Sequence, residues 1–117
     1  MTEGKIDISR ASKAIRDSRF VEALSMLESN LAKDPDHLES LYFAAVCSRY
    51  LKNYKDSQKY LENLLSKAPD MGRAYQELGH LSKATGNEDN AASHYRQACE
   101  LNPALISSWK SLFNYFT

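Results

Sequence analysis

Glu77 and His80 provide a spacing that some metal centres use. A Glu-x-x-His pair lies on one face of a helix, and helical di-iron sites combine two such pairs with two further inward carboxylates. This chain has one pair and no second one, and His37 and His94 show no metal-ligand spacing with a cysteine. We therefore expect no metal and no cofactor.

The remaining reactive side chains fit no catalytic pattern. Cys47 and Cys99 are far apart, both fall on apolar helix faces, and they are predicted to be buried structural thiols. Three evenly spaced glycines do not form the Gly-x4-Gly-Lys-Ser/Thr loop that cradles phosphate. The three histidines stand in no nucleophile arrangement. The sequence thus predicts a chain that is not itself an enzyme.

Composition narrows the partner classes. The 117 residues carry 15 basic and 15 acidic side chains, intermixed along the chain, which disfavours nucleic acid and anionic membranes as partners. No stretch approaches the roughly 18 apolar residues of a membrane span, and Leu41 to Cys47 is interpreted as core. The polar N-terminus shows no signal peptide, so we expect a cytoplasmic protein.

A single period organises the whole chain. Pro35, Pro69 and Pro103 are equally spaced. Other columns repeat in phase with them: small residues stand 12 and 24 positions before each proline, and apolar residues stand 8 and 4 positions before it. These columns are Ala23, Ser57 and Ala91; Ala11, Ala45 and Gly79; Leu27, Leu61 and Tyr95; and Leu31, Leu65 and Cys99. A fixed period of this length indicates a helical-repeat architecture.

Each unit reads as two helices. The first helix of the second unit is predicted to end at Lys52-Asn53. The first helix of the third unit is predicted to end at Thr85-Gly86-Asn87, where the glycine permits a positive φ. The proline ends the second helix, because it lacks an amide hydrogen and disfavours helical geometry at the preceding residue. Asp36 and Asp70 follow directly and are predicted to cap the next helix or to place negative charge at its start.

These residues resemble the tetratricopeptide repeat, most clearly in the third unit. There the pattern comprises Tyr75, Leu78, Gly79, Gly86-Asn87, Ala91, Tyr95, Ala98 and Asn102-Pro103. The resemblance implies an all-α fold, a right-handed α-α superhelix of about seven helices. It implies one domain over residues 1–117, with repeats at 4–37, 38–71 and 72–105 and a half repeat at 106–117. Asp7 and Arg10 depart from this pattern, since bulky apolar residues are expected at their positions.

In such a solenoid the first helix of each pair lines the concave side and forms a groove. Helical spacing places most of the aromatic residues of this groove in unit two. This aromatic cluster resembles an anchor site for a peptide. The alternative is that neighbouring helices cover those rings. The predicted groove residues are Tyr42, Phe43, Val46, Arg49 and Tyr50 in unit two; Arg73, Gln76, Glu77, His80 and Lys83 in unit three; Lys110 and Asn114 in the last helix; and Ser12 and Arg16 in unit one.

One groove type of the family grips the C-terminal carboxylate of a peptide with lysine, asparagine and arginine side chains. At the matching positions this chain has Ile8, Ser12 and Phe43, and it has Glu77 where a base is expected, although Arg73 fits one role. Lys110 and Asn114 match the opening pair of such a clamp, which would need units beyond Thr117. We therefore do not expect a carboxylate clamp within these residues.

The chain ends inside a predicted helix whose partner helix is missing. Trp109, Leu112 and Phe116 form an apolar stripe on it. Either the chain is a fragment of a longer protein, which we favour, or the stripe is buried against a second copy in a homodimer.

A narrower resemblance concerns the run from Arg73 to Leu81 together with Asn102 to Leu105 and Ser108-Trp109. It is similar to the repeat region that precedes a sulfotransferase domain in certain bacterial proteins. The leading interpretation is a non-catalytic module that binds a peptide or helix of a partner protein in its groove. The alternatives are an accessory domain of an enzyme encoded downstream, such as a sulfotransferase, and a self-association module.

Overall fold

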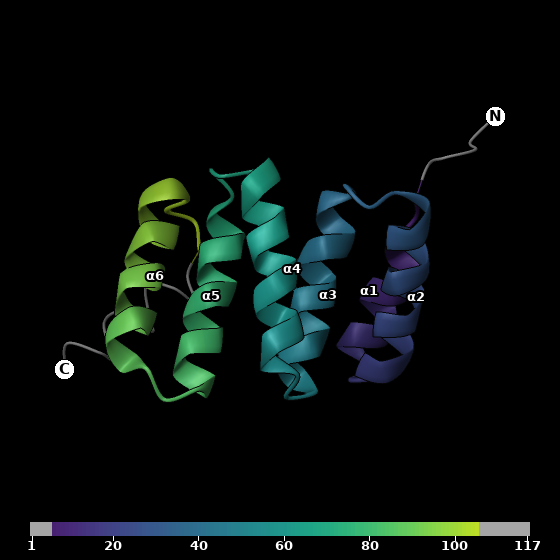
Figure 1. Ribbon diagram of the computed structural model, residues 1–117, viewed down its shortest axis with the longest axis horizontal. Coiled ribbons are helices and arrows are strands. Elements are labelled where there is room, and N and C mark those ends of the chain that lie inside the picture. Colours follow the sequence, from purple (N-terminus) through teal and green to yellow (C-terminus); the bar gives the residue numbers. More distant parts are fainter. Residues whose placement is uncertain (1–5, 106–117) are drawn as a thin grey trace. The chain divides into compact units, whose positions relative to one another are not determined.

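A computed structural model describes residues 6–105 of the chain (Figure 1). These residues form helices and turns and no strand, which confirms the all-helical fold. The helices are α1 (Ser9–Arg16), α2 (Phe20–Lys33), α3 (Leu38–Tyr50), α4 (Tyr54–Lys67), α5 (Gly72–Ala84) and α6 (Glu88–Leu101). The further helix predicted within residues 106–117 lies outside the described residues.

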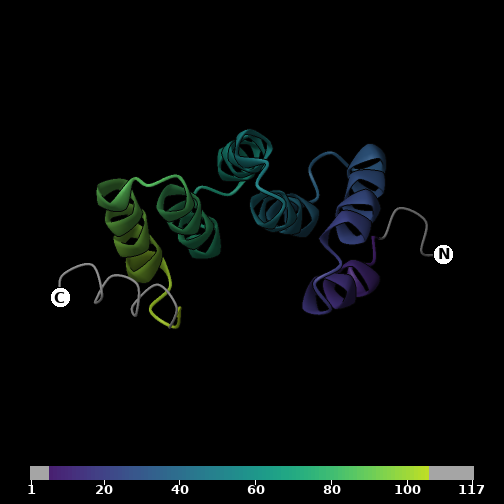
Figure 2. The same cartoon turned by 90° about the horizontal axis from the view of Figure 1, so that it is seen from below.

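The helices group into two compact units, Met1–Lys67 and Ala68–Thr117. In the first unit α1 packs on α2, α2 on α3 and α3 on α4, and in the second unit α5 packs on α6. Within the first unit, Figure 2 shows α1 and α3 on one side and α2 and α4 on the other. The predicted single domain and its division into four repeats remain predictions.

The turn inside each helix pair contains one residue with a positive φ angle, and these residues follow the same period as the sequence. Ser18, Lys52 and Gly86 have φ angles of 61°, 65° and 83°, and they are separated by the same interval as the three prolines. The residue after each of them donates its backbone amide to a carbonyl in the last turn of the preceding helix. These bonds join Arg19 to Ala14, Asn53 to Ser48 and Asn87 to Ser82, each with an N···O distance of 2.8 Å. This geometry is the Schellman motif, in which a left-handed residue ends a helix and satisfies its last carbonyls.

The small columns lie where the two helices of a pair approach each other. Ala23 and Ser57 are 0 % exposed, and the Ser57 hydroxyl donates to the Ala45 carbonyl on the facing helix at 2.9 Å. In the second unit a Cβ atom added at Gly79 would lie 2.5 Å from the Tyr95 ring, which is closer than carbon atoms tolerate. The small residues are therefore a steric requirement of the close helix packing.

The start of α3 corrects one prediction about capping. The N-cap of α3 is His37, whose Nδ1 atom accepts from the Ser40 amide at 3.2 Å, and the N-cap of α5 is Met71, which makes no side-chain cap. Asp36 and Asp70 thus stand one residue too early to cap, and the prediction that they do so is wrong. The α2–α3 turn places the imidazole of His37, rather than the Asp36 carboxylate, beside the free amides of the first turn.

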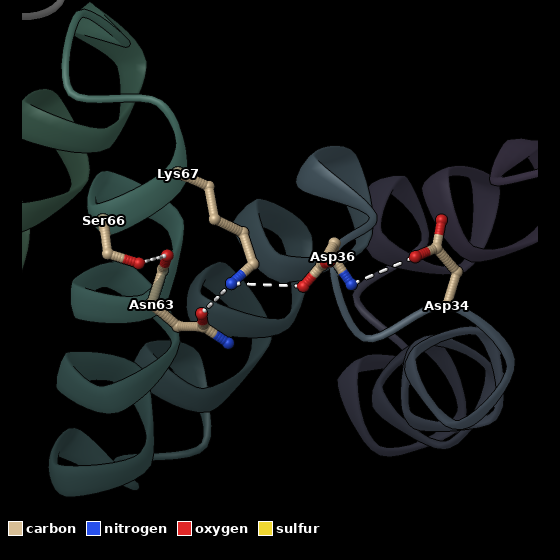
Figure 3. A network of polar contacts seen from close by, with 5 residues as sticks. All are labelled: Asp34, Asp36, Asn63, Ser66 and Lys67. Carbon is tan, nitrogen blue, oxygen red and sulfur yellow. Dashed lines mark hydrogen bonds and ion pairs between the residues drawn. The ribbon is translucent and has the colours of Figure 1, made fainter.

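Asp36 instead joins its turn to the end of α4 (Figure 3). Its Oδ1 atom pairs with Lys67 Nζ at 3.2 Å, and the same ammonium donates to Asn63 Oδ1 at 2.8 Å. The Asp36 amide is held in turn by Asp34 Oδ1 at 3.1 Å. Because Asp36 is largely exposed, we expect this network to orient the turn more than to stabilise it.

Tyr60 on α4 packs against the core of the first unit. Burial, and then the negative charges of Glu28 and Asp56, raise the pKa of its phenol above the ordinary value of 10.0. A neutral phenol is therefore favoured in the folded chain relative to the unfolded one.

The positive-φ turns generate a prediction about stability. Ser18→Gly and Lys52→Gly should each raise the free energy of unfolding by about 0.5–1 kcal/mol, because glycine adopts a positive φ without steric cost and this gain exceeds the added chain entropy. Gly86→Ala should lower it by about 1 kcal/mol, since no atom lies within 4 Å of the added Cβ and the cost is one of backbone alone. Urea unfolding measures all three. The matched control is Lys59→Gly inside α4, which should lower the free energy of unfolding by about 1 kcal/mol. A decrease of the same size in Lys52→Gly would contradict the prediction.

The shifted pKa of Tyr60 generates a prediction about alkaline pH. The unfolded chain releases this proton near pH 10 and the folded chain only above it, so the contribution of Tyr60 to stability is complete below pH 10 and is lost as pH rises further. Tyr60→Phe should show a smaller loss of unfolding free energy above pH 10 than the wild type. Glu28→Gln should lower the phenol pKa in an ultraviolet titration, and an unchanged titration would show that Glu28 does not act on Tyr60.

Candidate functional site

The predicted aromatic residues of α3 divide into core and surface. Phe43 is half-buried and packs against the core cluster of the first unit, which includes Ala14, Leu27 and Ala44. Tyr42 is half-buried and meets the Phe43 ring edge to face, with centroids 5.2 Å apart. Tyr50 is 53 % exposed, one of few large apolar side chains so open to solvent in the described part of the chain. Phe43 thus serves packing, whereas about half of the Tyr50 surface remains exposed to solvent.

Tyr50 is held in place by a residue that the sequence patterns did not single out. Its ring stacks on that of Phe20, the first residue of α2, with centroids 4.4 Å apart and planes within 3°. The Arg49 guanidinium lies 4.5 Å from the centroid of the Tyr50 ring, within the range of a cation–π contact. No local signal in the sequence pairs Phe20 with a residue 30 positions later.

Two of the predicted groove residues are buried. Val46 is 8 % exposed and Glu77 is 2 % exposed, so neither side chain offers contact surface. Val46 lies one turn from Tyr42 and Tyr50 on α3, whose rings are large enough to shield it. Glu77 lies one turn from Ala74 and Leu81, which are both buried, so it shares the inward face of α5. We therefore leave Val46 and Glu77 out of the contact surface.

The other predicted residues of α5 remain at least partly accessible. Arg73 and Lys83 are exposed, and Gln76 and His80 are half-buried. His80 Nδ1 lies 2.8 Å from the hydroxyl of Tyr95 on α6, which fixes the imidazole against the facing helix. α5 thus presents two exposed cations beside a positioned imidazole.

The remaining predicted site residues lie outside the described residues. They are the groove residues Lys110 and Asn114 and the apolar stripe of Trp109, Leu112 and Phe116. In the first unit, Ser12 is half-buried and accepts from Arg16 Nη1 at 3.3 Å, and Arg16 itself is exposed.

Possible chemistry in the described residues is limited by burial. His37 Nδ1 lies 2.7 Å from Ser40 Oγ, a contact of the kind that activates a nucleophile and one that the sequence patterns did not reveal. Ser40 is 0 % exposed, however, so no substrate reaches its hydroxyl in this conformation, and the pair acts as a helix cap. Among residues 6–105, no three His, Cys, Asp or Glu side chains are grouped to hold a metal ion.

Cys47 and Cys99 are not in disulfides within the described residues and are 0 % and 3 % exposed, which confirms their prediction as buried cysteines. Burial, with a smaller contribution from Glu100, raises the pKa of the Cys99 thiol. A protonated, inaccessible thiol is a poor nucleophile.

A shallow pocket of about 350 Å³ marks the departure from the repeat pattern in the first unit. Asp7 and Arg10 line it at the positions where bulky apolar residues are expected, opposite Met26 and Asn30 of α2. Two charged side chains do not fill the space that two large apolar ones would. The result is a shallow polar hollow between the start of α1 and α2.

Comparisons with known proteins agree with this architecture. Sequence models of the tetratricopeptide repeat match residues 14–78 and residues 72–105. No curated protein matches the chain. Within the described residues, no helix is long and apolar enough to cross a membrane.

Solved structures with the same fold share little sequence with this chain. The first TPR domain of human RPAP3 has a TM-score of 0.87 at 16% identity, with 97% of this chain and 90% of that chain covered. The first TPR of Spaghetti (RPAP3) bound to the HSP90 peptide SRMEEVD has a TM-score of 0.81 at 17% identity, covering 91% and 84%. An O-GlcNAc transferase of Thermobaculum terrenum has a TM-score of 0.86 at 20% identity, covering 92% of this chain and 21% of that one.

The first of the two sequence matches spans more than half of the 117 residues, and the second continues it through α6. The chain belongs to the tetratricopeptide repeat family.

Proposed function

We propose that this chain is a protein-interaction module that binds an extended segment or a helix of a partner protein along the first helices of its repeats. The observation that carries the proposal is the exposed ring of Tyr50, which is already ordered by its stack on Phe20. A ring that is fixed before binding loses little conformational entropy when a partner side chain packs on it. Aromatic residues beside arginine are also the residue types enriched in interaction hot spots.

The contact surface that we propose is smaller than the predicted groove. In the first unit it comprises Tyr42, Arg49 and Tyr50 on α3 and Arg16 on α1. In the second unit it comprises Arg73, Gln76, His80 and Lys83 on α5. Each unit contributes its own surface, and the residues omitted are those whose side chains pack in the core.

Binding of a peptide by a related fold supports the class of function. The Spaghetti repeat domain is described as bound to an HSP90 peptide that ends in Glu-Glu-Val-Asp. In this chain, Ile8, Ser12 and Phe43 hold positions where a carboxylate-gripping groove has polar or basic residues, and Ser12 already accepts from Arg16. We therefore propose peptide binding without a clamp for a terminal carboxylate.

A second candidate is an accessory repeat domain of an enzyme. It is favoured by the O-GlcNAc transferase, in which a domain similar to this chain makes up about a fifth of the protein. The predicted sulfotransferase association belongs to this candidate, because a catalytic domain would have to be encoded beyond these residues. A sequence that continues past Thr117 into a strand and a phosphate-binding turn would favour it.

The proposed surface generates a prediction for partner capture. Tyr42→Ala and Tyr50→Ala should each weaken the affinity for the native partner by at least tenfold, about 1.4 kcal/mol. The partner recovered from a lysate of the native host should decrease accordingly. Circular dichroism should remain helical, because Tyr50 is half exposed and neither ring belongs to the buried core. Phe43→Ala, in contrast, should lower the melting temperature, because its ring packs against the core cluster.

The matched control for these variants is Tyr54→Ala, a half-buried tyrosine at the start of α4, which should retain partner capture. Undiminished capture by both Tyr42→Ala and Tyr50→Ala would contradict the proposed surface. Loss of helical signal in these two variants would assign the rings to the core instead.

A further inference from the structure

We draw no further inference here: the strongest candidate, the shallow polar hollow between the start of α1 and α2 that Arg10, Ser29 and Asn30 help to line, is surrounded mostly by solvent-exposed side chains, and nothing in the described part of the chain shows what would occupy it.

Discussion

Close approach of the two helices within each pair is the constraint on which the rest of the structure depends. Ala23, Ser57 and Ala91 occur at the same place in successive pairs and are all buried, and at Gly79 even a methyl group would collide with the Tyr95 ring. Because the backbones are so near, one side-chain hydroxyl reaches a carbonyl of the facing helix. The bulky residues of the neighbouring columns then fill the space that remains.

This constraint also determines which surfaces remain for binding. Each first helix uses one face against its second helix, and in the first unit α3 also packs against α2 of the preceding pair. Phe43 packs against the core and Val46 is buried, whereas Tyr50, the last residue of α3, remains half exposed between Phe20 and Arg49. In the first unit, two residues of the interaction surface that we propose, Arg16 and Tyr50, therefore lie in the last turns of their helices, where more of the side chain remains exposed.

Much of the fold was predictable because the repeat imposes the same local requirement three times. The three prolines predict helix ends, and Ser18, Lys52 and Gly86 all adopt the positive φ that the sequence signalled only at Gly86. Serine and lysine carry no such signal, so their backbone geometry follows from the period alone. The cap of α3 was missed for a different reason, since histidine is an uncommon cap and an aspartate stood one position away.

By itself, the sequence determined the helical pairs, their breaks, the small and bulky columns and the family, because these follow from steric rules that repeat with the period of the prolines. The candidate site was less predictable, since helical spacing predicts which residues share a face but exposure depends on which side chains of other elements arrive there. Only the tertiary structure decided that Phe20 orders Tyr50, that Glu77 turns inward and that Asp36 reaches Lys67. Each of these depends on a contact between residues distant in sequence, or on the shielding of one side chain by others, and no periodic signal encodes such contacts.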